Sequence, residues 1–152
     1  MNPPELTHVV IRWDKIPIFA GLQSRALDFL AERAKEVLAI PGQILLREGE
    51  TGNRMFLIRS GEVRVWKGEN DPVEIANLRA GDFFGEMCIL ETLPRAATVE
   101  AITDSVLCTL SSINFYQLYE AMPDQYSILV LNIARDLSRR LRRLDEAFAA
   151  RA

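Results

Sequence analysis

Glycine is distributed very unevenly along this chain. Seven of the eight glycines lie between Gly42 and Gly85, and no glycine follows Gly85. Glycine is the residue that most easily adopts the positive φ angles of tight turns. The spacing therefore predicts that residues 42–85 form a series of short strands joined by turns.

The segments between and after these glycines have the composition of strands. Residues 62–67 alternate polar and apolar side chains with a period of two, as expected of a strand with one buried face. The candidate strands are residues 55–58, 62–67, 73–78, 97–102 and 106–110. Short strands at close spacing favour a sandwich or barrel over alternating strand–helix units. The predicted fold class is mainly β with flanking helices.

Helical patterns lie on both sides of this region. Residues 24–37 predict a helix with Ser24 as its N-cap. Residues 113–121 predict a second helix that is capped by Ser112 and ended by Pro123. A long third helix is predicted over residues 124–148.

The long helix carries apolar residues at heptad spacing. They are Val130, Ala134, Leu137, Leu141, Leu144 and Phe148, which are separated by four, three, four, three and four positions. This spacing suits a coiled-coil seam in a homodimer, and it equally suits a helix that packs on its own barrel. The pattern alone does not choose between the two.

The overall charge and hydropathy exclude several classes of protein. Lys and Arg number 18 and Asp and Glu number 21, which gives a net charge of −3 and disfavours a general binder of nucleic acid or of membrane surfaces. We interpret the basic run Arg139–Arg143 as a solvated or ligand-facing edge of the long helix. No apolar run approaches the ~18 residues of a membrane span, and residues 1–5 do not resemble a secretory signal. The sequence predicts a cytoplasmic protein.

The residues that most often carry catalysis or metal binding are scarce. His8 is the single histidine, and Cys88 and Cys108 are the only cysteines. These numbers disfavour a multi-histidine metal site, a structural zinc site and a disulfide scaffold. They also disfavour a barrel enzyme of the cupin type, which binds its metal through clustered histidines. The sequence therefore predicts a binding module without catalytic activity, metal or cofactor.

One stretch has the chemistry of an anion site. Gly85 allows the backbone to approach a ligand, and the turn over residues 86–89 presents backbone N–H groups to an anion. Arg95 can return to the same place and hold a phosphate with its planar guanidinium. Glu86 suits a hydroxyl group on the far side of the same ligand. A cyclic phosphate next to a sugar hydroxyl meets both requirements, whereas a triphosphate would need a lysine-containing loop that this chain lacks.

Residues 84–99 read FGEMCILETLPRAATV, which resembles the phosphate-binding cassette of the cyclic nucleotide-binding domain family. This family includes the regulatory subunits of protein kinase A, the catabolite activator protein and cyclic nucleotide-gated channels. The resemblance extends over about residues 16–148. It implies a single domain over residues 1–152 with an N-terminal extension over residues 1–15. It also implies an eight-stranded β-roll with an N-terminal helix, a short cassette helix and C-terminal lid helices.

The resemblance assigns expected roles to individual positions. Glu86 corresponds to the glutamate that accepts from the ribose 2′-hydroxyl, and Arg95 corresponds to the arginine that pairs with the phosphate oxygens. The remaining positions expected at the ligand are Gly85, the backbone amides of Met87, Cys88 and Ala96, and the barrel residues Val65 and Ile75. Relatives that prefer cGMP commonly have threonine at the position of Ala96, so the expected ligand is cAMP rather than cGMP.

The implied function is that of a sensor in which cAMP binding moves the C-terminal helices over the base. Four residues of the long helix are candidates to cover the base: Arg135, Arg139, Arg140 and Leu144. The effector is unknown and is expected on another chain. The alternative is a dimerisation or docking module of the same fold that does not bind nucleotide. The presence of Gly85, Glu86 and Arg95 together favours the sensor.

Overall fold

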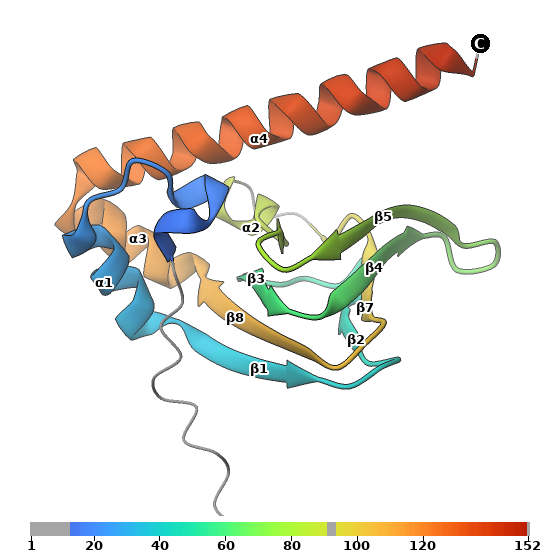
Figure 1. Ribbon diagram of the computed structural model, residues 1–152, viewed down its shortest axis with the longest axis horizontal. Helices are drawn as coiled ribbons and strands as arrows, with labels where there is room; N and C mark the ends of the chain where they lie inside the picture. Colours follow the sequence, from blue (N-terminus) through green and yellow to red (C-terminus); the bar gives the residue numbers. More distant parts are fainter. Residues whose placement is uncertain (1–12, 91–93, 152) are drawn as a thin grey trace, which may run out of the picture.

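The computed structural model describes residues 13–90 and 94–151. It shows a roll of β-strands with helices packed against one side, and a long C-terminal helix that runs across the top of the roll (Figure 1). Eight antiparallel strands form two sheets, which confirms the predicted β-roll with flanking helices. His8 and cassette residues 91–93 lie outside the described residues.

The strands divide equally between the two sheets. One sheet has the order β1 (Lys35–Ala39), β8 (Ser105–Ser111), β3 (Arg54–Ser60) and β6 (Phe83–Phe84). The other has the order β2 (Ile44–Leu46), β7 (Thr98–Ala101), β4 (Glu62–Lys67) and β5 (Val73–Arg79). The five predicted strand segments correspond to β3, β4, β5, β7 and β8. The helices are α1 (Ser24–Arg33), α2 (Met87–Leu90), α3 (Ser112–Ala121) and α4 (Pro123–Ala150), preceded by the short 3₁₀ turns η2 (Trp13–Lys15) and η3 (Pro17–Phe19).

Strand β3 separates two hydrophobic cores. Its residues Phe56 and Ile58 point into the roll and pack with the apolar residues of the opposite sheet. Met55 and Leu57 point to the other face and pack against the helices. This alternation follows from the period of two along a strand. The sheet that contains β3 is therefore buried on both faces, and the helices are held to the roll through it.

The first helix is shorter than the sequence predicts. α1 ends at Arg33, and residues 35–39 form strand β1 instead of further helical turns. Strand β1 pairs with β8 over its whole length, from Lys35 opposite Thr109 to Ala39 opposite Ser105. This long-range pairing satisfies the backbone groups of residues 35–39 that face β8, and it leaves no local signal in the sequence. The predicted cap is also wrong, since Gln23 is the N-cap and makes no side-chain cap.

Helix α3 begins with a reciprocal cap one residue earlier than predicted. The Ser111 hydroxyl accepts a hydrogen bond from the Asn114 N–H at 3.2 Å, and the Asn114 side-chain oxygen accepts from the Ser111 N–H at 2.9 Å. Such a capping box pairs two backbone donors that the helix itself leaves unsatisfied. Helix α3 ends at Ala121, and Pro123 is the first residue of α4.

The N-terminal half of α4 packs on the domain. Leu129 and Ile133 are fully buried in the helical core. The Asn132 side-chain amide donates to the carbonyl oxygens of Ile18 and Ala20 at 2.9 Å and 2.7 Å. The Gln125 side-chain oxygen accepts from the Gln23 N–H at 2.7 Å. These contacts fix the start of α4 to the N-terminal segment.

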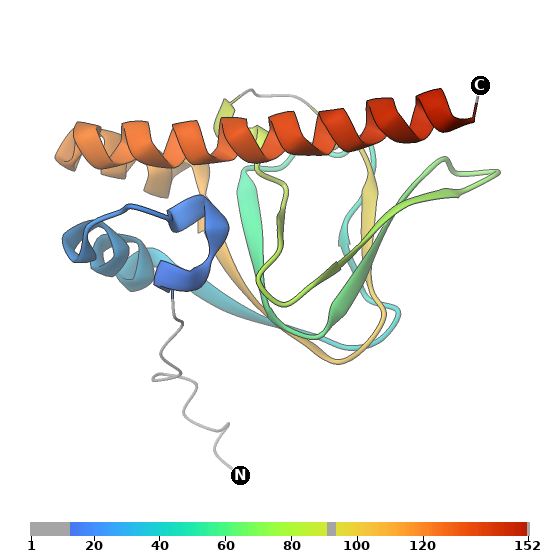
Figure 2. The same ribbon diagram turned by 45° about the horizontal axis from the view of Figure 1, so that its top comes forward.

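The apolar stripe predicted along α4 is not its buried face. Leu137 is partly buried, but Leu141 is 60%, Leu144 is 59% and Phe148 is 80% exposed. The reason is that α4 makes its main contacts with α3 and η3, which lie along its N-terminal half (Figure 1). The C-terminal half of α4 runs out toward the side of the roll that holds the β4–β5 hairpin (Figures 1 and 2). None of the described helices combines the length and apolar character needed to cross a membrane.

Candidate functional site

The residues of the predicted anion site follow the end of strand β6. The chain leaves β6 at Phe84, turns at Gly85 with a φ of +78°, and enters the single helical turn α2. It then returns through Arg95 to strand β7. Helix α2 contacts strand β3 and helix α3. The cassette therefore lies where the roll meets the helices.

The position of Arg95 is fixed by its backbone and by its side chain. Its N–H donates to the Glu50 carbonyl oxygen and its carbonyl oxygen accepts from the Gly49 N–H, both at 2.8 Å. The guanidinium Nη2 donates to the Arg54 carbonyl oxygen at 2.8 Å, and Nη1 donates to the Gly85 carbonyl oxygen at 3.2 Å. None of the ion pairs found among residues 13–90 and 94–151 involves Arg95. Among the described residues the partners of this guanidinium are neutral, and a half-buried cation in such a setting is well suited to attract an anion.

Glu86 is a buried acid on the same cassette. Its side chain is only 7% exposed, and its Oε1 lies 3.7 Å from Nη1 of Arg140 on helix α4. Burial raises the pKa of Glu86 above its ordinary value, and the nearby Asp136 adds to this. A backbone hydrogen bond and the charges of Arg140 and Arg95 act in the opposite direction on the same pKa. Glu86 is therefore an acid whose charge depends on the cations around it.

Arg140 connects helix α4 to the cassette. Its Nε lies 2.8 Å from Asp136 Oδ2, and its Nη2 donates to the Phe83 carbonyl oxygen at 3.3 Å. Its guanidinium also lies 4.6 Å from the centre of the Phe83 ring, which is a cation–π distance. The sequence analysis offered Arg140 only as one of four residues that could cover a base. Its contact with Glu86 was missed, because no spacing in the sequence indicates which turn of α4 passes the cassette.

The other predicted ligand residues are more exposed. Met87 is 47% exposed, Ala96 is exposed, and the Cys88 N–H donates to the Gly85 carbonyl oxygen at 3.4 Å. Val65 on β4 packs against the core inside the roll. Ile75 is 48% exposed and lies where the register of β4 and β5 shifts by one residue, between Ala76 and Glu74. The structure thus brings Gly85, Glu86 and Arg95 together most closely, while Ile75 sits in a bulge at the sheet edge.

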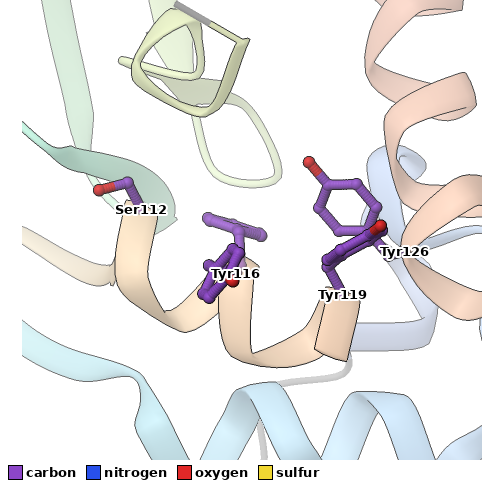
Figure 3. Close-up of a pocket in the computed structure, with 5 residues that line it drawn as sticks. Ser112, Tyr116, Tyr119 and Tyr126 are labelled. Atoms are coloured by element: carbon purple, nitrogen blue, oxygen red, sulfur yellow. The ribbon is translucent and has the colours of Figure 1, made fainter. Parts of the chain in front are cut away.

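A hollow lies on the helices, apart from the cassette, and was not predicted from the sequence. It has a volume of about 380 Å³ and is lined by Ser112, Phe115, Tyr116, Tyr119 and Tyr126. Figure 3 shows Tyr116 and Tyr119 on one helix facing Tyr126 on another. The rings of Tyr119 and Tyr126 meet edge to face at 5.3 Å. With no charged side chain in its lining, this hollow offers no anion site.

The described residues hold no cluster of three or more His, Cys, Asp or Glu side chains that could bind a metal ion. In the described part of the cassette and its surroundings, the charged groups discussed above are Arg95, Arg140, Glu86 and Asp136, and they are joined by backbone groups. Such a set can hold an anion and a hydroxyl group.

Comparison with known proteins gives consistent results. The family model described as "Cyclic nucleotide-binding domain" matches residues 37–122. A cAMP-dependent protein kinase regulatory subunit from Yarrowia lipolytica is 38% identical over 104 residues, which are 68% of this chain and 28% of that protein. A cyclic nucleotide-gated potassium channel from Rhizobium etli is 36% identical over 109 residues, which are 72% of this chain and 30% of that protein. The chain thus spans less than a third of the length of these relatives.

The solved structures agree with this match. A cyclic nucleotide-binding domain from Methylobacillus flagellatus has a TM-score of 0.82 at 25% identity, with 92% of this chain and 84% of that chain covered. The catabolite activator protein of Thermus thermophilus has a TM-score of 0.76 at 28% identity, with 88% and 62% covered.

Proposed function

Because the chain belongs to the cyclic nucleotide-binding domain family, we propose that it binds cAMP in preference to cGMP and transmits the binding to helix α4. The observation that carries this proposal lies within the described part of the cassette: the Arg95 guanidinium donates to two neutral carbonyl groups, and the buried Glu86 carboxylate lies on the same cassette. The roles below are those that the family resemblance implies, combined with the contacts of these residues.

Arg95 binds the cyclic phosphate in this proposal. Its two terminal nitrogens donate to the carbonyl oxygens of Gly85 and Arg54, so both point to one place beside the cassette. Two phosphate oxygens can replace or supplement these neutral acceptors, and a bidentate pair with an anion adds the attraction between opposite charges to the hydrogen bonds. The gain in interaction strength favours the bound state.

Glu86 binds the ribose. Its ionised carboxylate accepts a hydrogen bond from the 2′-hydroxyl, and it already lies within 3.7 Å of the Arg140 guanidinium. The base then lies toward strands β4 and β5, where Val65 and Ile75 supply apolar surface. Ala96 offers no side-chain hydroxyl to a guanine, which is the reason for the proposed preference for cAMP.

Helix α4 responds to the ligand through Arg140. This arginine joins Glu86 and Phe83 of the cassette region to Asp136 on the helix. A ribose hydroxyl that donates a hydrogen bond to Glu86 changes the environment of the carboxylate that Arg140 contacts. It therefore changes the energy of the Arg140–Glu86 contact. A ligand can shift a conformational equilibrium only by its difference in affinity for the two states. The Arg140 contact is where we locate that difference.

Titration calorimetry with cAMP, cGMP and 5′-AMP tests the proposed function. We expect saturable binding of cAMP, weaker binding of cGMP by about tenfold, which corresponds to about one hydrogen bond, and no measurable binding of the dianionic, non-cyclic 5′-AMP. Binding of no cyclic nucleotide would instead favour the docking-module alternative. Equal binding of cAMP and cGMP would contradict the proposed preference for cAMP but not the proposed binding site.

The role of Glu86 predicts sensitivity to one hydroxyl group. For the wild type, 2′-deoxy-cAMP is expected to bind more weakly than cAMP by about 1.5–3 kcal/mol, the range for a hydrogen bond to a charged group. Glu86→Gln should cost only about 1 kcal/mol in cAMP affinity, because the amide oxygen still accepts a hydrogen bond. Calorimetry with both ligands and both proteins measures this. If the wild type does not distinguish the two ligands, Glu86 does not bind the ribose.

We also propose a homodimer through the exposed half of α4. Leu141, Leu144 and Phe148 continue a heptad pattern on a face that nothing in the described chain covers. The effector that such a dimer would act on is a separate chain or another part of a longer protein.

The dimer predicts that a polar residue in the stripe promotes dissociation. Leu144→Gln should raise the dimer dissociation constant at least tenfold, or about 1.4 kcal/mol, because two buried leucines are lost per dimer. Arg142→Gln, on the same turn but outside the stripe, is the matched control and should leave it unchanged. Light scattering with gel filtration over a concentration series gives the answer. A wild-type chain that stays monomeric at every concentration would contradict the dimer.

A further inference from the structure

We infer that Gly52 is a positioning residue for Arg95: its missing side chain makes the space in which the Arg95 guanidinium lies. This inference rests on the proposed function, because it concerns how the phosphate-binding group is held. Gly52 itself lies in the loop before strand β3 and has no side chain that could contact a ligand. Its effect is exerted through the arginine alone.

The backbone conformation does not explain why residue 52 is a glycine. Seven of the eight glycines have a positive φ, the conformation that other residues rarely adopt. Gly52 is the exception among them, since its φ lies outside that region. An alanine could therefore take its backbone conformation without strain. The question is therefore whether the absence of a side chain at residue 52 provides space for a neighbouring group.

The space at Gly52 is filled by the Arg95 guanidinium. A Cβ atom added to Gly52 would lie 2.5 Å from Arg95 Nε and 2.7 Å from Arg95 Cζ, and closer still to Nη2. These distances are far below the ~3.5–4.0 Å of an ordinary contact between heavy atoms. Every one of the three nearest atoms belongs to this one side chain. The guanidinium would have to move if residue 52 were larger.

Gly85 lies against the same guanidinium from the cassette. A Cβ added there would come within 3.0 Å of Arg95 Nη1 and 2.9 Å of the Arg54 carbonyl oxygen. The guanidinium thus lies close to two glycines, with the carbonyl groups of Arg54 and Gly85 as its acceptors. Gly85 has a φ of +78°, so a substitution there would also strain the backbone. Gly52 is the position at which the space can be tested alone.

At Gly52 an added Cβ would clash with a side chain, whereas at Gly61 it would clash with the backbone. At Gly61 an added Cβ would meet the Asp104 carbonyl oxygen and the Ser105 Cα atom, both at 2.7 Å, and these backbone atoms cannot move aside. At Gly52 the clash is with the far end of a long side chain, which can rotate away at little cost. A larger residue at position 52 should therefore leave the fold stable and displace the group that holds the phosphate.

The test compares Gly52→Ala with Thr51→Ala, a matched change in the same exposed loop, in calorimetric titrations with cAMP and in thermal unfolding. We expect Gly52→Ala to fold and to unfold within a few degrees of the wild type, because the restriction of the unfolded chain by alanine partly offsets the hydrogen bonds that the displaced Arg95 loses. Its cAMP affinity should fall at least about tenfold, since the planar guanidinium loses its two-point geometry. Thr51→Ala should bind as the wild type does. Wild-type affinity in Gly52→Ala, or an unfolded Gly52→Ala, would overturn the inference.

A second background separates action through Arg95 from a general effect on the loop. In Arg95→Lys the slim ammonium group needs no planar space, so adding Gly52→Ala should change the remaining cAMP affinity by less than about twofold. An equal loss in both backgrounds would contradict the positioning role.

A measurement without ligand keeps this inference distinct from the proposed function. The Arg95 Nε–Hε resonance of the ligand-free protein, assigned by its disappearance in Arg95→Lys, should shift in Gly52→Ala and stay in place in Thr51→Ala. If the resonance shifts while the wild type binds no cyclic nucleotide, the proposed function fails and the contact between Gly52 and Arg95 stands. If it does not shift, the inference about Gly52 fails whatever the ligand.

Discussion

Replacing Arg95 with alanine is expected to weaken cAMP binding by about 2–5 kcal/mol, the range for losing one partner of a buried charge pair. The phosphate would then lie at the cassette without the only guanidinium held there by the carbonyl groups of Gly85 and Arg54. Calorimetric titration of both proteins with cAMP measures the loss.

The fold should tolerate this change. The Arg95 side chain makes two hydrogen bonds to carbonyl oxygens, at an expected net contribution of about 1 kcal/mol each. Arg47→Ala is the matched control, because it removes the same charge from an exposed position in the preceding loop region. It should leave the affinity unchanged. An Arg95→Ala protein that folds and binds cAMP within about twofold of the wild type would exclude Arg95 from the site.

Replacing Arg140 with alanine is expected to destabilise the ligand-free domain by about 1–3 kcal/mol near neutral pH, the cost of leaving a buried polar group without its partner. Glu86 is buried, and Arg140 is the cation nearest to its carboxylate. Removing Arg140 leaves that carboxylate charged in a site that water barely reaches. Denaturant unfolding of the wild type and Arg140→Ala measures the difference.

The effect of Arg140→Ala should depend on pH in a defined direction. Burial raises the pKa of Glu86, so the folded domain takes up a proton at this group at a higher pH than the unfolded chain does. The ion pair exists only while Glu86 is charged. Arg140 lowers the pKa of Glu86, so this pKa is higher in Arg140→Ala than in the wild type. The difference in stability should therefore be full above the Glu86 pKa of the folded variant and should disappear as the pH falls below that of the folded wild type.

A double-mutant cycle assigns this energy to the pair. In the Glu86→Gln background, Arg140→Ala should cost much less, because an amide needs no cation. Arg139→Ala, the exposed neighbour on the same helix, is the control and should be neutral in both backgrounds. A loss of stability that is the same at all pH values and in both backgrounds would show that Arg140 acts only through its packing on Phe83.

The sequence was most informative where the relevant signal is local. The alternation of polar and apolar residues in 62–67 predicts strand β4, because a strand with one buried face alternates by geometry. The cluster FGE and the distant Arg95 predict a shared site, and the Arg95 guanidinium does bond to Gly85. These features depend on residues close together in the chain or on one motif.

The features that the sequence did not reveal depend on long-range packing. Strand β1 is stabilised by its pairing with β8, which lies about 70 residues further along the chain. Without knowledge of that pairing, the first residues of β1 are predicted as the end of the preceding helix. The heptad stripe of α4 suited both a dimer seam and a face packed on the barrel, and the exposure of Leu141 and Leu144 shows that this part of the stripe is not packed on the barrel. The contact of Arg140 with Glu86 depends on where α4 crosses the cassette, which only the assembled fold determines.

The crystal structure of the domain with cAMP tests the central claim most directly. Our account predicts that the Arg95 nitrogens Nη1 and Nη2 lie within hydrogen-bond distance of the exocyclic phosphate oxygens. It also predicts that a Glu86 carboxylate oxygen lies within hydrogen-bond distance of the ribose 2′-hydroxyl. A complex in which the nucleotide lies elsewhere, while Arg95 keeps only its carbonyl contacts with Gly85 and Arg54, would contradict it.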